Sequence, residues 1–193
     1  MQHLITPYSR IFEPYVWKDD VFSQDELDRL QSLARRAGAD AEVGTSNGGA
    51  VVKEVRRSQV NWLAKSSDTA WVFERLAHAG AQLNARFYGF DLTGFGEALQ
   101  MTNYDSSEHG MYGWHQDFNS QVSRKLTLVV QLSDPSEYEG GNLEVLTNGS
   151  PARVRKQRGL LAAFPAWTLH QVTPVSQGNR QSLVAWISGP DFK

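Results

Sequence analysis

Cysteine is absent from this sequence of 193 residues. Its absence excludes disulfide bonds, iron–sulfur clusters and thiolate-bound metals, so any metal must be held by histidines and carboxylates. Long apolar runs are also missing, and the first residues lack the charged segment and apolar core of a signal peptide. We therefore expect neither a membrane span nor secretion, and we predict a cytoplasmic protein.

Neither sign of charge dominates, because the sequence has 19 basic and 21 acidic residues and a formal net charge of −2. No basic field favours nucleic acid. We expect a small-molecule or peptidyl substrate as partner, with no nucleic acid and no membrane, and the oligomeric state stays open. Hydrophobic residues make up 40%, which is typical of a globular chain long enough for its own core. Without a repeat or linker, residues 1–193 are predicted to form one domain.

The first half of the chain carries helical patterns. Residues 23–38 begin with Ser23 and Glu26 at capping-box spacing, and leucines recur behind them at helical intervals. A second helix is predicted from about residue 69 to 85. Between the two helices, residues 44–50 have loop composition and residues 51–63 alternate loosely like a strand.

From Leu99 onward the chain consists of short alternating segments separated by turn residues. The clearest alternation places two sets of side chains on opposite faces of one strand: Leu126, Leu128, Val130 and Leu132 against Lys125, Thr127, Val129 and Gln131. Further strands are predicted near residues 143–146, 158–165, 169–175 and 180–187. The pattern favours a mainly β fold, a β-sandwich or jelly roll buttressed by N-terminal helices. We expect helical support over about residues 1–98 and a β core over about residues 99–190.

One short stretch, "YGWHQDFNS", contains candidate metal ligands. On a strand, His115 and Asp117 would point to the same face. His170 lies on another predicted strand and can supply a third ligand. Two histidines and one carboxylate that leave other positions open form the facial triad of non-heme Fe(II) oxygenases. The open positions allow a bidentate cosubstrate and O2 to bind together.

A cation on the last predicted strand supports this interpretation. Arg180 follows His170 by ten residues and shares a strand face with Ser182, Val184 and Trp186. An arginine that faces the interior needs an anionic partner, because a buried unpaired charge is costly. A small dicarboxylate that chelates iron at one end and meets Arg180 and Ser182 at the other would satisfy these groups, and 2-oxoglutarate has that shape.

Three segments together resemble the prolyl 4-hydroxylase-like branch of the Fe(II)/2-oxoglutarate dioxygenases, and in particular the PKHD-type hydroxylases. They are "LQMTNYDSSEHGMYGWHQD", "RKLTLVVQLSDPSEYEGGNLEV" and "RGLLAAFPAWTLHQVTPVSQGNRQSLVAWISGP". The resemblance implies a double-stranded β-helix. It also implies an enzyme that couples decarboxylation of 2-oxoglutarate, to succinate and CO2, to hydroxylation of an unactivated C–H bond with O2.

The resemblance assigns roles to individual residues. It implies that His115, Asp117 and His170 bind Fe(II), and that Arg180 pairs with the distal carboxylate of 2-oxoglutarate with help from Ser182. Tyr104 matches a tyrosine near the cosubstrate, and Trp186 matches an aromatic residue that lines the iron pocket. Gln131 stands where several family members have a tyrosine that holds the distal carboxylate, so its role departs from the pattern, although an amide can also donate a hydrogen bond.

Other functions compete with this one. A noncatalytic cupin-like module that binds a small ligand through a metal is the main alternative, although it has no need for both an open iron face and a carboxylate clamp. A halogenase is disfavoured because such enzymes lack the carboxylate ligand that Asp117 supplies. Relatives hydroxylate prolyl residues, free amino acids and other small molecules, so the expected substrate is of amino-acid type, free or within a polypeptide.

Several nearby residues have plain structural interpretations as well as functional ones. His109 precedes His115 by six residues and is expected to be solvated. Trp114 and Phe118 either contact substrate or pack on the opposite sheet face. Residues 44–57 form either a lid, with Lys53, Arg56 and Arg57 meeting an acidic group of the substrate, or a solvated hairpin.

Overall fold

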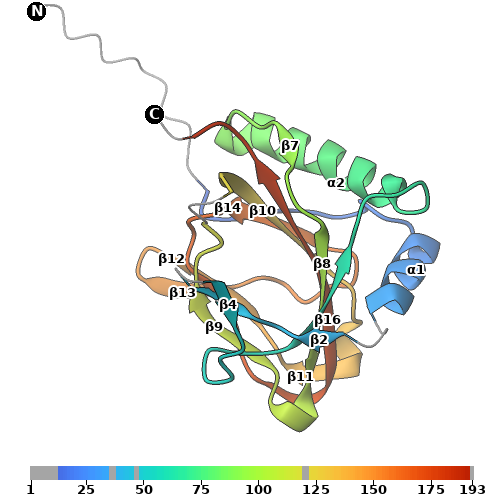
Figure 1. Ribbon diagram of the computed structural model, residues 1–193, viewed down its shortest axis with the longest axis vertical. Helices are drawn as coiled ribbons and strands as arrows, with labels where there is room; N and C mark the ends of the chain where they lie inside the picture. The colour runs from blue at the N-terminus through green and yellow to red at the C-terminus, as the bar shows by residue number, and fades with distance from the viewer. Residues whose placement is uncertain (1–12, 35–37, 46–47, 119–121, 192–193) are drawn as a thin grey trace, which may run out of the picture.

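The computed structural model describes residues 13–34, 38–45, 48–118 and 122–191. Its helices, α1 (Gln24–Ala34) and α2 (Ala70–Leu83), lie on the outside of a large antiparallel sheet. A smaller antiparallel sheet lies on the other side of the large one, as Figure 1 shows. This arrangement is the expected double-stranded β-helix buttressed by helices.

Local signals explain both helices. At the start of α1, the Ser23 N–H donates to Glu26 Oε2 (2.8 Å) and the Glu26 N–H donates to Ser23 Oγ (3.2 Å), which is the predicted capping box. The second helix begins close to its predicted start and continues as a π-helical turn (Asn84–Tyr88). It ends where Gly89 adopts a left-handed conformation with φ of 69°.

The large sheet contains most of the strands. In spatial order they are β1 (Val16–Lys18), β14 (Leu161–Pro165), β10 (Arg124–Gln131), β16 (Val175–Ser188), β8 (Leu99–Asp105), β6 (Gln59–Leu63) and β2 (Ala39–Asp40), with β7 (Gly94–Phe95) and β11 (Tyr138–Gly140) also paired to β16. The smaller sheet has the order β13 (Ser150–Arg153), β12 (Leu143–Thr147), β15 (His170–Val172), β9 (Met111–His115) and β5 (Arg56–Arg57). A separate hairpin joins β3 (Val43–Thr45) to β4 (Gly48–Ala50), and short 3₁₀ turns occupy Ser106–Glu108 and Pro135–Glu137.

Two hydrophobic clusters fill the spaces between the layers. One lies between the helices and the large sheet and contains Leu126, Leu128 and Val130 of β10. The other lies between the two sheets and contains Val129 of the same strand. The predicted alternation of β10 is therefore confirmed, and its opposite face turns Thr127 and Gln131 toward the smaller sheet.

The first half of the chain supplies more strands than the one predicted there. β1 and β2 lie at opposite edges of the large sheet, and the predicted segment is divided into β5 in the smaller sheet and β6 in the large one. The strand predicted over residues 51–63 begins only at Arg56. Residues 52–55 form a turn instead, in which the N–H groups of Val55 and Arg56 both donate to the Val52 carbonyl.

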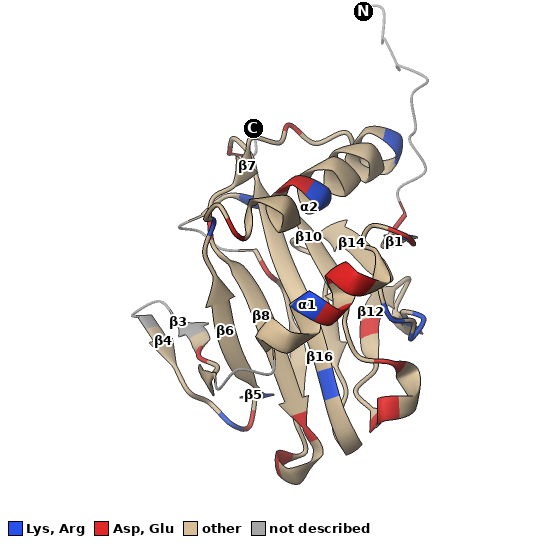
Figure 2. Cartoon of the chain, turned by 90° about the vertical axis from the view of Figure 1, so that its right-hand side faces the viewer, with Lys and Arg blue, Asp and Glu red and all other residues tan. Residues whose placement is uncertain are grey.

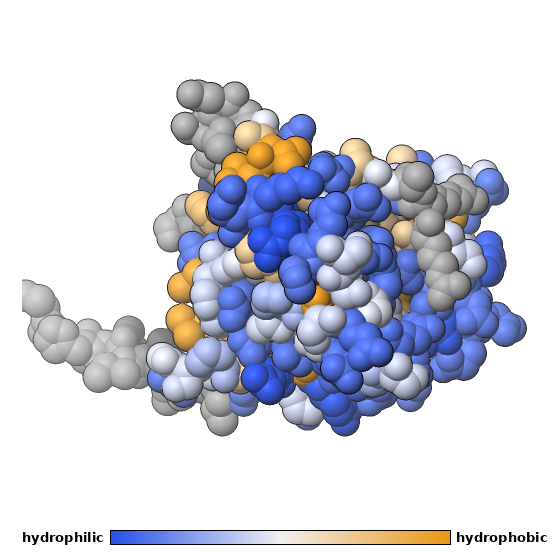
Figure 3. All heavy atoms as spheres, turned by 90° about the horizontal axis from the view of Figure 1, so that it is seen from below, coloured by the Kyte–Doolittle hydropathy of each residue, from blue (hydrophilic) through white to orange (hydrophobic). Residues whose placement is uncertain are grey.

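Charges are distributed unevenly between the layers. Figure 2 shows acidic and basic residues mixed on α1 and α2, whereas the sheet ribbons are largely uncharged. Strand β16 carries one charged residue, Arg180, and it is almost completely buried. The end of the molecule seen from below is mostly hydrophilic, with apolar residues toward its edges (Figure 3). Within the described ranges, neither helix has the length and apolar character needed to cross a bilayer.

Candidate metal centre

Two facing histidines lie at the centre of the smaller sheet. Strands β15 and β9 pair His170 with His115, and the two ring centroids are 4.1 Å apart. Asp117 Oδ1 lies 3.7 Å from His115 Nε2, and Asp117 Oδ2 lies 3.5 Å from His170 Nε2. One ligand atom from each residue lies within 4.8 Å of the other two. The structure thus brings together the three predicted ligands, as the only such group within the ranges described above.

Asp117 reaches this group by a different route from the one predicted. Strand β9 ends at His115, so Asp117 follows the strand instead of continuing it. Two contacts from β10 hold it in place: Thr127 Oγ1 donates to Asp117 Oδ2 (2.8 Å), and Arg124 Nη1 donates to the Asp117 carbonyl (3.2 Å). The large sheet therefore positions the carboxylate, whereas the smaller sheet positions both imidazoles.

Backbone contacts set the orientation of both imidazoles. The Nδ1 atoms of His115 and His170 lie 2.8 and 2.9 Å from the carbonyl oxygens of Gly113 and Thr168. A carbonyl accepts only, so each Nδ1 carries the proton and each Nε2 is left with a free lone pair. Both Nε2 atoms point toward Asp117. Two neutral imidazole nitrogens and one carboxylate are a suitable ligand set for Fe(II).

The electrostatics keep His115 and Asp117 free of protons. Burial lowers the pKa of His115 to about 3, and His170 also lowers it, although Asp117 and the Gly113 carbonyl act in the opposite direction. Burial alone would raise the pKa of Asp117, but the nearby imidazoles of His170 and His115 and the polar groups of Trp186 and Thr127 bring it below its ordinary value. The ionised Asp117 carboxylate therefore gives the group a negative charge that attracts a dication.

The depressed pKa of His115 predicts how the metal-free protein responds to acid. Its ordinary pKa is 6.5 and its folded pKa is about 3, so between these values the unfolded state binds more protons. The stability that depends on neutral His115 is complete above pH 6.5 and is lost as the pH falls toward 3. We expect the Tm of the metal-free protein to fall from about pH 7 to about pH 4, and His115→Gln to flatten this dependence.

A matched control uses the exposed His78 of α2, whose Nε2 forms a hydrogen bond with the Gln82 side chain. His78→Gln should keep the pH dependence of Tm that the parent shows. An equal fall of Tm with pH in the parent and in His115→Gln would contradict the lowered pKa of His115 as its cause.

The second predicted group forms around Arg180. This residue is 1% exposed, yet it meets no carboxylate in the part of the chain that the structure describes. Its Nη1 lies 3.5 Å from Ser182 Oγ and its Nη2 lies 3.4 Å from Gln131 Oε1, while its Nε is buried without a partner. The Tyr104 ring lies below the guanidinium, 5.3 Å from Cζ to centroid. A buried cation with such long contacts is suited to an incoming anion.

Strand register explains how these residues meet. β16 pairs Arg180 with Tyr104 on one side and Ser182 with Gln131 on the other. The Gln131 amide nitrogen donates to the Arg155 carbonyl (3.0 Å), so its oxygen faces Arg180. In this arrangement Gln131 orients the guanidinium and does not offer a donor to a ligand.

A glycine makes room for the arginine side chain. Gly141 has a φ of 57°, and a Cβ atom there would lie 3.0 Å from Arg180 Cδ. Any larger residue at this position would be strained in its backbone and would press on the guanidinium stem. The turn "EGGN" therefore contributes to the site as well as to the fold.

The structure adds residues that the sequence patterns did not single out. Tyr112 stacks on His115, with ring centroids 3.5 Å apart and planes 14° from parallel. The register between β15 and β9 shifts between the pairs His170–His115 and Val172–Tyr112, which is a β-bulge. Without the bulge, residues three apart would point to opposite faces. Alternation alone therefore gave no signal for Tyr112, whereas it already placed Thr127 on the inner face of its strand.

The ion pair between Arg124 and Glu97 lies beside Asp117. Arg124 donates to both carboxylate oxygens of Glu97, at 2.6 Å each, and its Cζ lies 3.9 Å from the Trp186 ring centroid. Trp186 itself pairs with Thr127 across β10 and β16. The predicted aromatic residue at this position thus lies beside the carboxylate ligand.

Other candidates lie away from the group. His109 caps a 3₁₀ turn with a φ of 49° and is exposed. Lys53 forms surface ion pairs with Asp40 and Glu108. Trp114 and Phe118 are 40% and 50% exposed, so both rings are partly open to solvent. The lid expected over residues 44–57 stays a prediction, and Ser46 and Asn47 at its tip lie outside the described residues.

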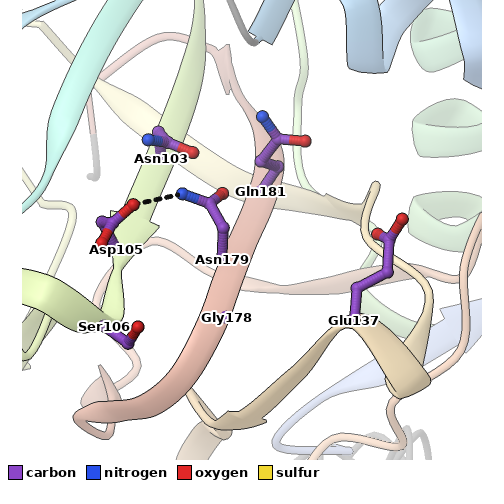
Figure 4. Close-up of a pocket in the computed structure, with 7 residues that line it drawn as sticks. All are labelled: Asn103, Asp105, Ser106, Glu137, Gly178, Asn179 and Gln181. Carbon is purple, nitrogen blue, oxygen red and sulfur yellow. Dashed lines mark hydrogen bonds between the residues drawn. The ribbon is translucent and has the colours of Figure 1, made fainter.

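A polar cleft of about 640 Å³ lies elsewhere, on the outer face of β8 and β16. Figure 4 shows Asn103, Asn179 and Gln181 around it, with the Asn179 amide directed at Asp105 (3.2 Å). These residues alternate with Tyr104 and Arg180, so they point away from the metal centre. The cleft is therefore separate from the candidate site.

Sequence comparisons agree with this geometry. Residues 99–188 match the 2OG-Fe(II) oxygenase superfamily. A PKHD-type hydroxylase of Nitrosomonas europaea is 31% identical over 181 residues, which are 88% of this chain and 76% of that protein. A PKHD-type hydroxylase of Synechococcus sp. (strain CC9605) is 41% identical over 85 residues, which are 42% of this chain and only 38% of that protein.

A solved structure shares the fold. It is a prolyl hydroxylase from Trichoplax adhaerens in complex with a peptide fragment of the hypoxia inducible factor oxygen degradation domain. It superposes with a TM-score of 0.75, covers 91% of this chain and 83% of that one, and is 14% identical. At this identity the likeness concerns the fold alone.

Proposed function

Because the chain belongs to the PKHD-type hydroxylases of the 2OG-Fe(II) oxygenase superfamily, we propose that it hydroxylates an unactivated C–H bond of an amino-acid-type substrate, free or within a polypeptide. Substrate, 2-oxoglutarate and O2 would give hydroxylated product, succinate and CO2. One oxygen atom enters the product hydroxyl and the other enters succinate. The supporting observation is the His115–Asp117–His170 group beside a buried arginine without a carboxylate partner.

Family membership makes the chain an enzyme of this class, with Fe(II), 2-oxoglutarate and O2 as cofactors. When bound, iron and 2-oxoglutarate supply the oxidising power that no side chain has. The residues fit them, since the three ligand atoms converge and both imidazoles present unprotonated Nε2 atoms.

Side chains of the protein would bind the cosubstrate and orient the metal ligands. Arg180 would hold the distal carboxylate of 2-oxoglutarate, with Ser182 and Gln131 orienting the guanidinium. Thr127 fixes the rotamer of Asp117 through Oδ2 and so leaves Oδ1 to ligate. Tyr112 stacks on His115 and Trp186 lies against Arg124, so these two rings would help to exclude water from the reacting C–H bond.

The substrate class rests on weaker support than the reaction. The structural neighbour from Trichoplax binds a peptide, and its fold is shared over 91% of this chain. Free amino acids and peptides share the chemistry that such a pocket recognises, so both belong to the proposal. A partner of this kind requires neither nucleic acid nor a membrane.

A cupin-like binding module explains less. Such a module needs a metal and a ligand, but it has no need for a fully buried arginine beside an open metal face. A halogenase also fits poorly, because Asp117 lies 3.7 Å and 3.5 Å from the two imidazole Nε2 atoms and so occupies the position that chloride would need.

An anaerobic titration tests the proposed function. Fe(II) followed by 2-oxoglutarate should produce a visible charge-transfer band that requires both additions, because the cosubstrate chelates the metal through two oxygens. His115→Ala should abolish the band, whereas His109→Ala should leave it unchanged, since that exposed histidine lies outside the group. Admission of O2 with amino acids or proline-containing peptides should then release succinate. Absence of the band in a folded protein would favour the binding module.

A further inference from the structure

Arg56 is a second buried arginine near the metal centre. It lies on edge strand β5 and is 6% exposed. The register between β5 and β9 pairs it with Tyr112, and its Cζ lies 4.5 Å from the centroid of that ring. Tyr112 in turn stacks on His115. A guanidinium, a phenol ring and a candidate iron ligand are therefore layered in that order.

The charge of Arg56 is not balanced. Its Nε donates to Ser58 Oγ (2.8 Å), and its Nη2 is buried without a hydrogen-bond partner. Across the described ranges, no carboxylate forms an ion pair with it. The neighbouring Lys53 and Arg57 behave differently: Lys53 pairs with surface acids, and Arg57 donates to two backbone carbonyls. Only Arg56 of the three turns inward.

The contacts that Arg56 makes do not explain its burial. A cation–π contact with Tyr112 offsets only part of the cost of removing a guanidinium from water. The cosubstrate does not supply the missing anion either, because Arg180 on the opposite sheet already faces its distal carboxylate in the proposed function. An anion from another molecule that binds beside Tyr112 would balance this charge.

We propose that Arg56 binds a carboxylate of the prime substrate and so restricts the enzyme to substrates that carry this group close to the reacting C–H bond. The inference rests on the proposed function and names its substrate class. A guanidinium fork matches a carboxylate through two parallel hydrogen bonds, and the unpaired Nη2 is available for one of them. The carboxylate is either the α-carboxylate of a free amino acid or an acidic side chain of a peptide.

The test compares acids with their amides. Anaerobic protein loaded with Fe(II) and 2-oxoglutarate is titrated with the free amino acids and with their α-amides, and then with proline-containing peptides that carry either glutamate or glutamine. At least one acid should bind about tenfold or more tightly than its amide, which is the usual strength of a charged hydrogen bond. A preference in the first panel identifies a free amino acid as substrate, and a preference in the second identifies a peptide side chain.

Three variants assign that preference to Arg56. Arg56→Met should abolish the acid-over-amide ratio without weakening amide binding, and Arg56→Lys should restore part of it. Arg57→Met, at the neighbouring half-buried arginine, should keep the full ratio. The Tm of metal-free Arg56→Met should equal or exceed that of the parent, because the change removes an uncompensated buried charge.

Two outcomes would overturn the inference. One is an equal affinity for acid and amide throughout both panels. The other is a preference that survives Arg56→Met, particularly with a lowered Tm, which would make Arg56 a packing residue only. The charge-transfer band of the same loaded samples tests the proposed function separately from the role of Arg56. If the band is present, the proposed function stands even when the inference about Arg56 fails.

Discussion

Replacing Asp117 by asparagine should abolish substrate-dependent succinate formation and weaken Fe(II) binding by more than about 100-fold, since outer partners of metal ligands alone change affinity about 10–100-fold. The substitution keeps the shape of the side chain and an oxygen for the Thr127 hydroxyl, which now donates to Oδ2 at 2.8 Å. It removes the single negative charge of the group. Calorimetric titration with Fe(II) under argon and a succinate assay measure the two effects.

The control for Asp117→Asn is Asp105→Asn, at an exposed carboxylate on the far face of the large sheet. It should leave both iron affinity and turnover unchanged. The metal-free Asp117→Asn protein should unfold within about 3 °C of the parent, roughly 1 kcal/mol for a chain of this size. Full activity in this variant would mean that the iron is held elsewhere.

Strand periodicity is a short-range property, so the sequence alone could predict which side chains of β10 and β16 share a face. Alternation places residues two apart on one face, and it correctly separates Leu128 from Thr127 on β10 and groups Arg180 with Ser182 on β16. Capping chemistry also acts locally, which is why the start of α1 was predictable from Ser23 and Glu26.

The features that escaped prediction depend on pairing between distant segments. The bulge in β9 that turns Tyr112 onto His115 arises from its register with β15, which no local pattern encodes. Whether Arg56 or Arg57 faces inward is likewise decided by the pairing of β5 with β9, because the preceding residues alternate too loosely to specify it. Asp117 reaches the metal centre through contacts to β10, and not through its own strand.

Arg180→Met should raise the KM for 2-oxoglutarate by more than about 100-fold, because breaking a buried charge pair costs about 3 kcal/mol or more. The parent arginine is 1% exposed, its contacts to Ser182 and Gln131 are 3.5 and 3.4 Å long, and its Nε has no partner. In the proposed function, the distal carboxylate of the cosubstrate relieves the cost of holding this buried cation. Methionine fills a similar volume without charge, so the metal-free variant should be as stable as the parent or more stable.

The pair of opposite effects in Arg180→Met distinguishes a cosubstrate clamp from a structural arginine. A structural role predicts a lower Tm with an unchanged KM for 2-oxoglutarate. A clamp predicts a raised KM with a Tm equal to or above that of the parent. Arg155→Met is the control, since the side chains of Arg155 and its ion-pair partner Asp19 are 56% and 37% exposed, where such pairs contribute little. A ligand that binds only the folded state raises Tm, and it raises Tm more the more tightly it binds. If 2-oxoglutarate raises the Tm of the parent but not that of Arg180→Met, its binding depends on the Arg180 guanidinium.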